Sequence, residues 1–259
     1  MLGVLVVARG QVFIGAAMAQ ASTLGVATAT WLGAASVGGL LTAGAMQTTL
    51  GVLTCIAAAM LLMRQPRSSR PGRGEEVTAW LFVGAAAMTV LLLAHHPLGM
   101  KQIQRLLASS VIGASRMDVI MFSTLAPLTA LLLLGAGRRL VLLIADPVMA
   151  AAVGMRLWLW NTAIAVGVGL GVGLAIGSSG LLYSFGCLVL PALIARHLCT
   201  QIRPMFWVSP LIAAVTSATG LFVAHTWNYP PGQMVVVLLC CGLVVAWAVI
   251  EVRERMLAT

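Results

Sequence analysis

The sequence has very little charge. Only 8% of its 259 residues are charged, and the six acidic side chains are too few to coat a soluble surface. No charged residue occurs between Val12 and Met63. A water-soluble domain cannot bury one uninterrupted apolar run of that length, whereas a bilayer favours it. The shortage of charge therefore excludes an ordinary soluble protein.

Cysteine is also scarce and lacks a recognisable pattern. The five cysteines form no CxxC pair, and Cys240 and Cys241 are adjacent, which is a poor spacing for holding one metal ion. All five lie in or beside apolar segments, where cysteine behaves as a small hydrophobic residue. Neither a cysteine metal site nor a disulfide framework is predicted.

Groups for catalysis are missing as well. No acidic residue falls in the middle of an apolar segment, where an ionisable group would indicate a functional site. The sequence contains no recognisable catalytic triad, paired carboxylate or metal-ligand cluster, and no polar stretch long enough for a soluble catalytic unit. We predict a single membrane domain over residues 1–259, without enzymatic activity. The six acidic residues are Glu75, Glu76, Asp118, Asp146, Glu251 and Glu254.

Apolar segments make up most of the chain, with 61% hydrophobic residues and a mean hydropathy of +1.04. A spanning helix needs roughly 20 apolar residues. The sequence therefore predicts an all-α fold, a polytopic transmembrane bundle of about eight spanning helices. The predicted spans are Val12–Gly33, Gly38–Met63, Val77–His95, Met117–Gly137, Leu157–Ile176, Gly180–Leu198, Met205–Thr226 and Gly232–Ile250.

Two further segments have separate interpretations. Pro97–Ser115 is weakly amphipathic and predicts a connector at the membrane interface. Met1–Ala8 is apolar but too short to cross a bilayer, and it lacks the positive charge that precedes a signal peptide core. We expect it to be the cytoplasmic end of a truncated first helix.

The net charge of +9 does not indicate nucleic-acid binding, because the basic residues lie in short loops between apolar runs. Placing the loop Arg64–Glu76 inside the cell leaves only Lys101, Arg105 and Arg116 outside. This asymmetry predicts a multi-pass protein of the bacterial cytoplasmic (inner) membrane. The twelve basic residues then inside are Arg9, Arg64, Arg67, Arg70, Arg73, Arg138, Arg139, Arg156, Arg196, Arg203, Arg253 and Arg255.

Glycines stud one predicted span at helical spacing. A spacing of four places two glycines on one helix face, where another backbone can approach closely. We predict helix packing here, since a dinucleotide-binding loop would need a strand before the glycines. The residues concerned are Gly167, Gly169, Gly171, Gly173 and Gly177.

Asp146-Pro147 begins a short apolar segment in the cytoplasmic loop. Aspartate favours the N-cap of a helix, proline its first position, and Gly154 a C-terminal cap. The sequence predicts a brief capped helix between arginines. Such a helix could dock into a groove of another protein or lie at the membrane surface, and the spacing alone favours neither.

The chain resembles the membrane permeases of ABC transporters that import zinc, manganese or iron. Four groups of residues carry the resemblance almost from end to end, in the expected order. They are Arg9 with Phe13-Ile14-Gly15 and Gly25; Asp146-Pro147 with Ala150 and Gly154; Gly180-Leu181-Leu182 with Leu190-Pro191-Ala192 and Ala195; and Gly220-Leu221 with Pro230-Pro231-Gly232.

The resemblance implies the partners and the mechanism. Two permeases, alike or different, would pair in the lipid bilayer, two ATPase subunits would bind beneath them, and an extracytoplasmic binding protein would deliver the metal. Asp146, Pro147, Ala150 and Gly154 would form the coupling helix that seats in an ATPase subunit. The permease itself would neither hydrolyse ATP nor carry a cofactor. The residues expected along the translocation pathway are Ala16, Gln20, Ser22, Pro191 and His225.

One departure from the family pattern concerns the cargo. Members that carry transition metals have an aspartate and, four residues later, a histidine where this chain has Ala16 and Gln20. Leu24 stands where proline is expected, and Asn228 where an acidic residue is common. Alanine and glutamine are poor ligands for a divalent ion. The sequence therefore leaves open a chelated metal, a pathway through other groups such as His225, an ATP-independent facilitator, and a relative that does not transport.

Overall fold

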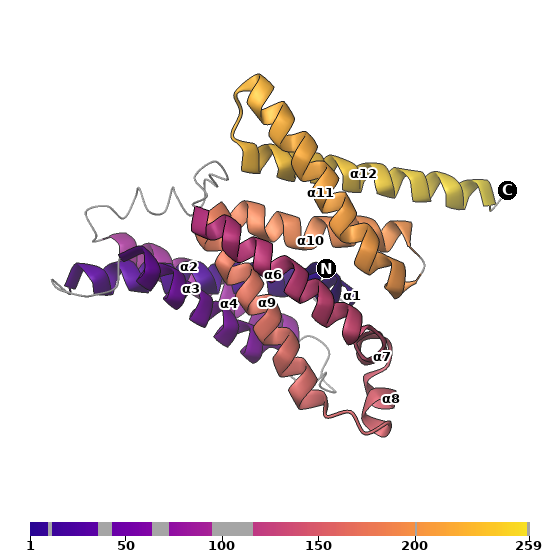
Figure 1. The fold of residues 1–259 in the computed structure, drawn as a ribbon, viewed down its shortest axis with the longest axis horizontal. Helices are drawn as coiled ribbons and strands as arrows, with labels where there is room; N and C mark the ends of the chain where they lie inside the picture. Colours follow the sequence, from indigo (N-terminus) through magenta and orange to yellow (C-terminus); the bar gives the residue numbers. More distant parts are fainter. Residues whose placement is uncertain (10–11, 36–42, 64–72, 95–115, 200, 258–259) are drawn as a thin grey trace.

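The computed structural model describes residues 1–9, 12–35, 43–63, 73–94, 116–199 and 201–257, and these parts form an all-α bundle (Figure 1). Apolar runs with few breakers form the long helices, and glycine, proline or charged residues separate them. The helices are α1 (Leu2–Ala8), α2 (Val12–Ala35), α3 (Ala43–Met63), α4 (Arg73–Ala94), α6 (Arg116–Gly135), α7 (Gly137–Ala145), α8 (Pro147–Ala152), α9 (Leu157–Ser179), α10 (Leu181–Leu198), α11 (Ile202–Trp227) and α12 (Pro231–Leu257).

The predicted polytopic all-α bundle is confirmed, and seven of its eight predicted spans are matched by a helix that can cross a bilayer alone. Seven of the described helices are long and apolar enough to cross a bilayer, and α6 with α7 makes an eighth if this pair, bent by 70°, is one span. The cytoplasmic loop predicted after Gly137 folds as α7 and α8, and Met1–Ala8 contributes α1. The predicted connector Pro97–Ser115 lies outside the described residues.

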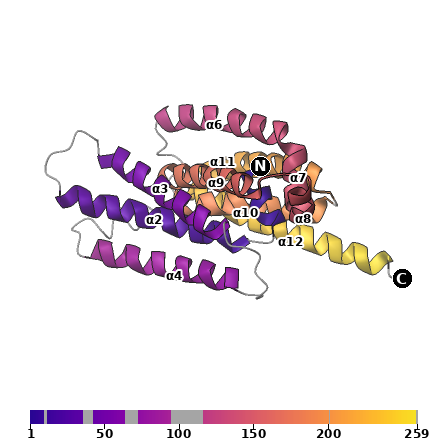
Figure 2. The same ribbon diagram turned by 90° about the horizontal axis from the view of Figure 1, so that it is seen from below.

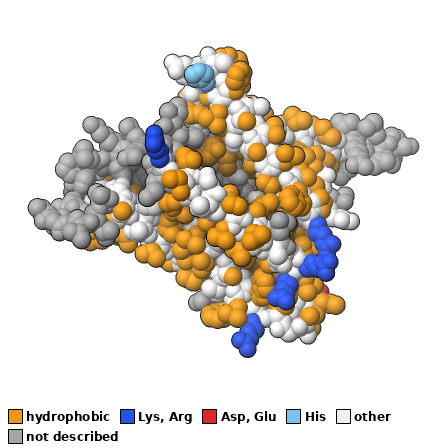
Figure 3. Space-filling view, in the orientation of Figure 1, with side chains coloured by type: hydrophobic (Ala, Val, Ile, Leu, Met, Phe, Trp, Pro, Cys, Tyr) orange, Lys and Arg blue, Asp and Glu red, His pale blue; other side chains and the backbone are white. Residues whose placement is uncertain are grey.

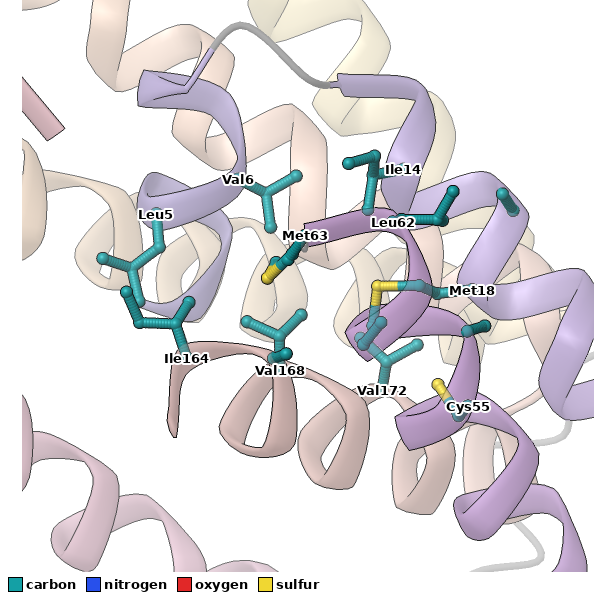
Figure 4. Packing of buried hydrophobic residues seen from close by; sticks show 14 of the residues in the cluster. Leu5, Val6, Ile14, Met18, Cys55, Leu62, Met63, Ile164, Val168 and Val172 are labelled. Carbon is teal, nitrogen blue, oxygen red and sulfur yellow. The ribbon is translucent and has the colours of Figure 1, made fainter. Parts of the chain in front are cut away.

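Helix α2 is the centre of the bundle. It packs against α3, α4, α9 and α10, and it is more deeply buried than the other spans. Met18 of α2 meets Cys55 and Leu62 of α3 and Val168 and Val172 of α9 in the main apolar cluster (Figure 4). Helix α4 covers the outer side of α2, whereas α6 stands apart from the core (Figure 2).

Glycines set the distance between α9 and α3. A Cβ atom built on Gly169 would lie 2.8 Å from Cα of Ile56, and one on Gly173 would lie 2.9 Å from Cα of Val52. These two glycines therefore bring the helix backbones together, as small residues do in membranes. Gly177 is only in ordinary contact with Thr48, at 4.0 Å.

The packing role predicted for all five glycines of α9 is too broad. Gly171 has a close neighbour in α1, since its Cβ position lies 2.8 Å from Cδ1 of Leu2, but no described residue of another helix lies within 4 Å of a Cβ placed on Gly167. The i,i+4 spacing creates two glycine faces on α9, and only the face with Gly169 and Gly173 meets α3. Gly167 therefore makes no close contact with another of the described helices.

One end of the bundle collects basic residues. Arginine side chains gather at the end where α7 and α8 lie (Figures 1 and 3). Exposed tryptophans occur within two turns of the ends of the candidate membrane spans on both sides, as they do at membrane–water interfaces. Trp158, Trp207 and Trp247 belong to the basic end, and Trp31 and Trp227 to the opposite end.

Candidate functional site

Helix α8 is a short helix with a complete N-cap. The Asp146 carboxylate oxygen Oδ1 accepts hydrogen bonds from the backbone N–H groups of Val148 and Met149, each at 2.9 Å. Pro147 occupies the first helical position, where no N–H donor is needed. The predicted N-terminal cap is confirmed, and it satisfies donors that a six-residue helix could not otherwise pair.

The end of α8 depends on Gly154. Its φ of +82° lies in the left-handed region, which residues other than glycine and asparagine rarely adopt. The Gly154 N–H donates to the carbonyl of Ala151 and the Met155 N–H to that of Ala150, at 3.0 and 3.1 Å. This pair of bonds is a Schellman motif, which turns the chain sharply toward α9.

Helix α8 presents an apolar surface to the outside. The side chains of Val148, Met149 and Val153 are exposed, while Ala150 is fully buried and packs α8 onto the bundle. An exposed cluster of large apolar side chains on a capped helix is a feature of protein docking sites. The exposed side chains of Val148, Met149 and Val153 therefore form a fixed apolar surface at the basic end of the molecule, which we call the α8 knob.

Helices α7 and α8 are joined by one residue. Asp146 is both the C-terminal cap of α7 and the N-cap of α8. Helix α7 is seen nearly end-on in Figure 1, so it runs across the direction of the long spans. Its apolar face, with Leu140, Leu143 and Ile144, is buried in the main cluster. Motion of α8 would therefore be passed directly to α7 and the core.

One face of α2 is less covered than the rest. Between Ile14 and Ala29 every residue is buried except Ala16, Gln20, Leu24 and Thr28, which are half-buried and recur every fourth position. Ala16 and Gln20 thus share one partly open face. The Gln20 side-chain oxygen Oε1 accepts a hydrogen bond from Thr23 Oγ1 at 3.2 Å. The partner in this hydrogen bond is a neutral hydroxyl group.

Ser22 lies on another face of α2 and is completely buried. Its hydroxyl has no hydrogen-bond partner among the residues that the structure describes, and a Cβ on Gly51 of α3 would lie 3.4 Å from it. Gly25 of α2 also packs on the α3 backbone, with Leu50 O at 2.5 Å from its Cβ position. Ser22 is therefore a packing residue of the α2–α3 contact, and its predicted place along an open pathway is not seen in this chain.

The other two predicted pathway residues are placed differently again. Pro191 is fully buried inside α10, whereas His225 is exposed in the last turn of α11. The structure thus brings Ala16 and Gln20 together and gathers neither Ser22, Pro191 nor His225 on that face. Within the described parts of the chain, no group of three or more His, Cys, Asp or Glu side chains is placed to hold a metal ion.

Two polar contacts were not predicted from the sequence. The Arg9 guanidinium donates to the side-chain oxygen of Asn161 at 2.9 Å, tying the end of α1 to α9. The Trp247 indole N–H donates to His197 Nε2 at 2.8 Å, linking α12 to the end of α10. Their partners lie 152 and 50 residues apart, so only the tertiary arrangement reveals them.

The chain is similar to two manganese transport proteins. Over 197 residues the chain is 22% identical to the manganese transport system membrane protein MntB of Synechocystis sp., covering 76% of this chain and 64% of MntB. It is also 22% identical over 244 residues to the manganese transport system membrane protein MntC of Halalkalibacterium halodurans, covering 92% and 77% of the two chains.

A solved structure has the same fold. PsaBC from Streptococcus pneumoniae in complex with Fab superposes with a TM-score of 0.75 at 19% identity, covering 95% of this chain and 84% of that one. The sequence model of the ABC 3 transport family matches residues 1–250. Because this match spans nearly the whole chain, the protein is a member of the ABC 3 transport family.

Proposed function

We propose that this protein is the membrane permease subunit of an ATP-driven importer for a divalent transition metal or its chelate. ATP hydrolysis would take place on a separate ATPase subunit, two permeases would pair, and an extracytoplasmic protein would deliver the cargo. The chain would act as one permease domain in a bacterial cytoplasmic membrane. The observation that carries the proposal is α8, a doubly capped apolar knob in a chain that matches the family from residue 1 to 250.

The knob has the physical properties that coupling requires. It is exposed, so a subunit outside the membrane can reach Val148 and Met149. It is fixed by side-chain and backbone hydrogen bonds at both ends. It connects through Asp146 alone to α7, whose apolar face is part of the core. Force applied to α8 therefore reaches the spanning helices without a flexible linker.

Reconstitution tests the proposal. The permease and the ATPase subunit that co-purifies with it are placed in proteoliposomes, and uptake of manganese, zinc and iron is measured with and without ATP. We expect uptake that requires both ATP and the ATPase. Uptake that needs neither would instead show a facilitator, and no uptake with any cargo would favour a relative without transport activity.

The partly open face of α2 predicts how the cargo specificity can be changed. Replacing Ala16 by aspartate together with Gln20 by histidine puts a carboxylate and an imidazole four residues apart on this face. We expect the Mn²⁺ concentration that gives half-maximal uptake to fall roughly tenfold or more, since even the loss of a group that only supports a metal ligand changes metal affinity about 10- to 100-fold.

The control replaces the same positions by side chains without ligand atoms, Ala16→Leu with Gln20→Phe. This variant should gain nothing. An equal gain in both variants, or no gain in the Asp/His variant, would show that the face does not meet the metal.

A further inference from the structure

A second surface at the basic end of the molecule combines charge with exposed apolar side chains. Arg138 and Arg139 lie in the first turn of α7 and are both exposed. The α6 helix enters this turn at a bend of 70°. The last turns of α6 expose Leu128, Leu131 and Leu132. Two exposed arginines therefore follow the exposed leucines of α6 at the start of the next helix.

A third arginine comes from a neighbouring helix. α11 begins beside α7, and its residues Ile202 and Phe206 pack against the apolar cluster that holds the buried face of α7. Arg203, between them in sequence, is exposed. Trp207 follows one turn later and is also exposed, which marks the level of the lipid headgroups.

These arginines have no carboxylate within ion-pair distance among the described residues. The ion pair found in that part of the chain joins Arg255 to Glu251. The carboxylate near α7 is that of Asp146, which accepts the amides of α8. Arg138, Arg139 and Arg203 thus present positive charge that an external anion can neutralise.

We infer that Arg138, Arg139 and Arg203 bind the phosphate of an anionic phospholipid whose acyl chains lie along α6. Guanidinium groups pair with phosphate oxygens through two parallel hydrogen bonds. Exposed leucines above the arginines match acyl chains, and the tryptophan places the arginines at headgroup depth. An acidic surface of a soluble subunit would match the arginines but could not cover the leucines of α6 within the membrane.

The test uses the full chain in mixed detergent micelles with phosphatidylglycerol and phosphatidylcholine, and native mass spectrometry counts the lipids retained. We expect the chain to retain phosphatidylglycerol preferentially. In the double variant R138Q/R139Q the ratio of retained phosphatidylglycerol to phosphatidylcholine should fall about 30-fold, because each arginine near a charged headgroup contributes about fivefold. The variant R138K/R139K should keep only part of it, because lysine preserves the charge but cannot form the two parallel hydrogen bonds.

Arg116 provides the matched control, since it is exposed at the opposite end of the same α6 helix. R116Q should leave the lipid preference unchanged. The inference is overturned if R138Q/R139Q retains phosphatidylglycerol as well as the unmodified chain does. It is also overturned if that variant keeps its lipids and loses only the bound ATPase subunit. No ATPase is needed for the lipid measurement, so failure of the proposed transport function would not affect it.

Discussion

Replacing Asp146 by alanine together with Gly154 by valine reduces ATP-driven uptake roughly tenfold or more while the protein stays folded. The alanine removes the N-cap, which costs about 1 kcal/mol, and valine at a left-handed position costs about 1–2 kcal/mol more. A six-residue helix has no spare stability to offset this loss, because isolated short helices are only marginally stable in water. The initial rate of uptake in proteoliposomes measures the loss.

Conservative replacements separate the shape of α8 from its chemistry. Asparagine caps a helix as well as aspartate does, and it tolerates the left-handed conformation. Asp146→Asn and Gly154→Asn should therefore retain most of the transport. The unfolding temperature of the Ala/Val variant should fall much less than these local costs would give for the whole bundle, because α8 is largely exposed and can unravel locally while the spanning helices stay packed. Normal uptake by the Ala/Val variant would remove α8 from the mechanism.

Replacing Gly169 by leucine has the largest expected effect on stability. The Cβ position is 2.8 Å from the Ile56 backbone, so α9 and α3 must separate, and Val168 and Val172 lose their packing in the main cluster. Overpacking of this kind costs about 3 kcal/mol, which corresponds to roughly 10 °C in unfolding temperature. The shift is measured by heating the protein in detergent and recording the fraction that remains monodisperse at each temperature.

Gly167 is a closely matched control for this experiment. It lies in the same helix, two residues away, and no described residue of another helix lies within 4 Å of its Cβ position. Gly167→Leu should therefore change the unfolding temperature little. Equal destabilisation by both leucines would mean that helix propensity or lipid exposure, rather than the contact with α3, decides the outcome.

The features predictable from the sequence are those set by local chemistry or by the membrane. Charged and glycine-rich segments predicted where the spanning helices begin and end, because a bilayer penalises charge strongly. Asp146-Pro147 predicted the start of α8, since an N-cap depends only on groups two or three residues away. The cap geometry and the family match thus required no knowledge of tertiary contacts.

Features that depend on how helices rotate against one another were not predictable. The glycine spacing in α9 describes two faces equally well, and only the packing against α3 selects Gly169 and Gly173. Ser22 and Gln20 are two residues apart on α2, yet one is sealed against α3 and the other is partly open. The contact between Trp247 and His197 likewise joins helices whose pairing no local pattern reveals.

Site-specific cross-linking tests most directly whether α8 is the contact with the ATPase. Met149→Cys is introduced after replacing the exposed Cys240 and Cys241 by alanine, and a short cross-linker that is coupled to this thiol at one end and is photoreactive at the other is activated in the assembled complex. The account predicts a cross-link between position 149 and the ATPase subunit, and none from Tyr229→Cys at the opposite end of the bundle. A complex that hydrolyses ATP and transports metal while position 149 stays unlinked and open to thiol labelling would contradict it.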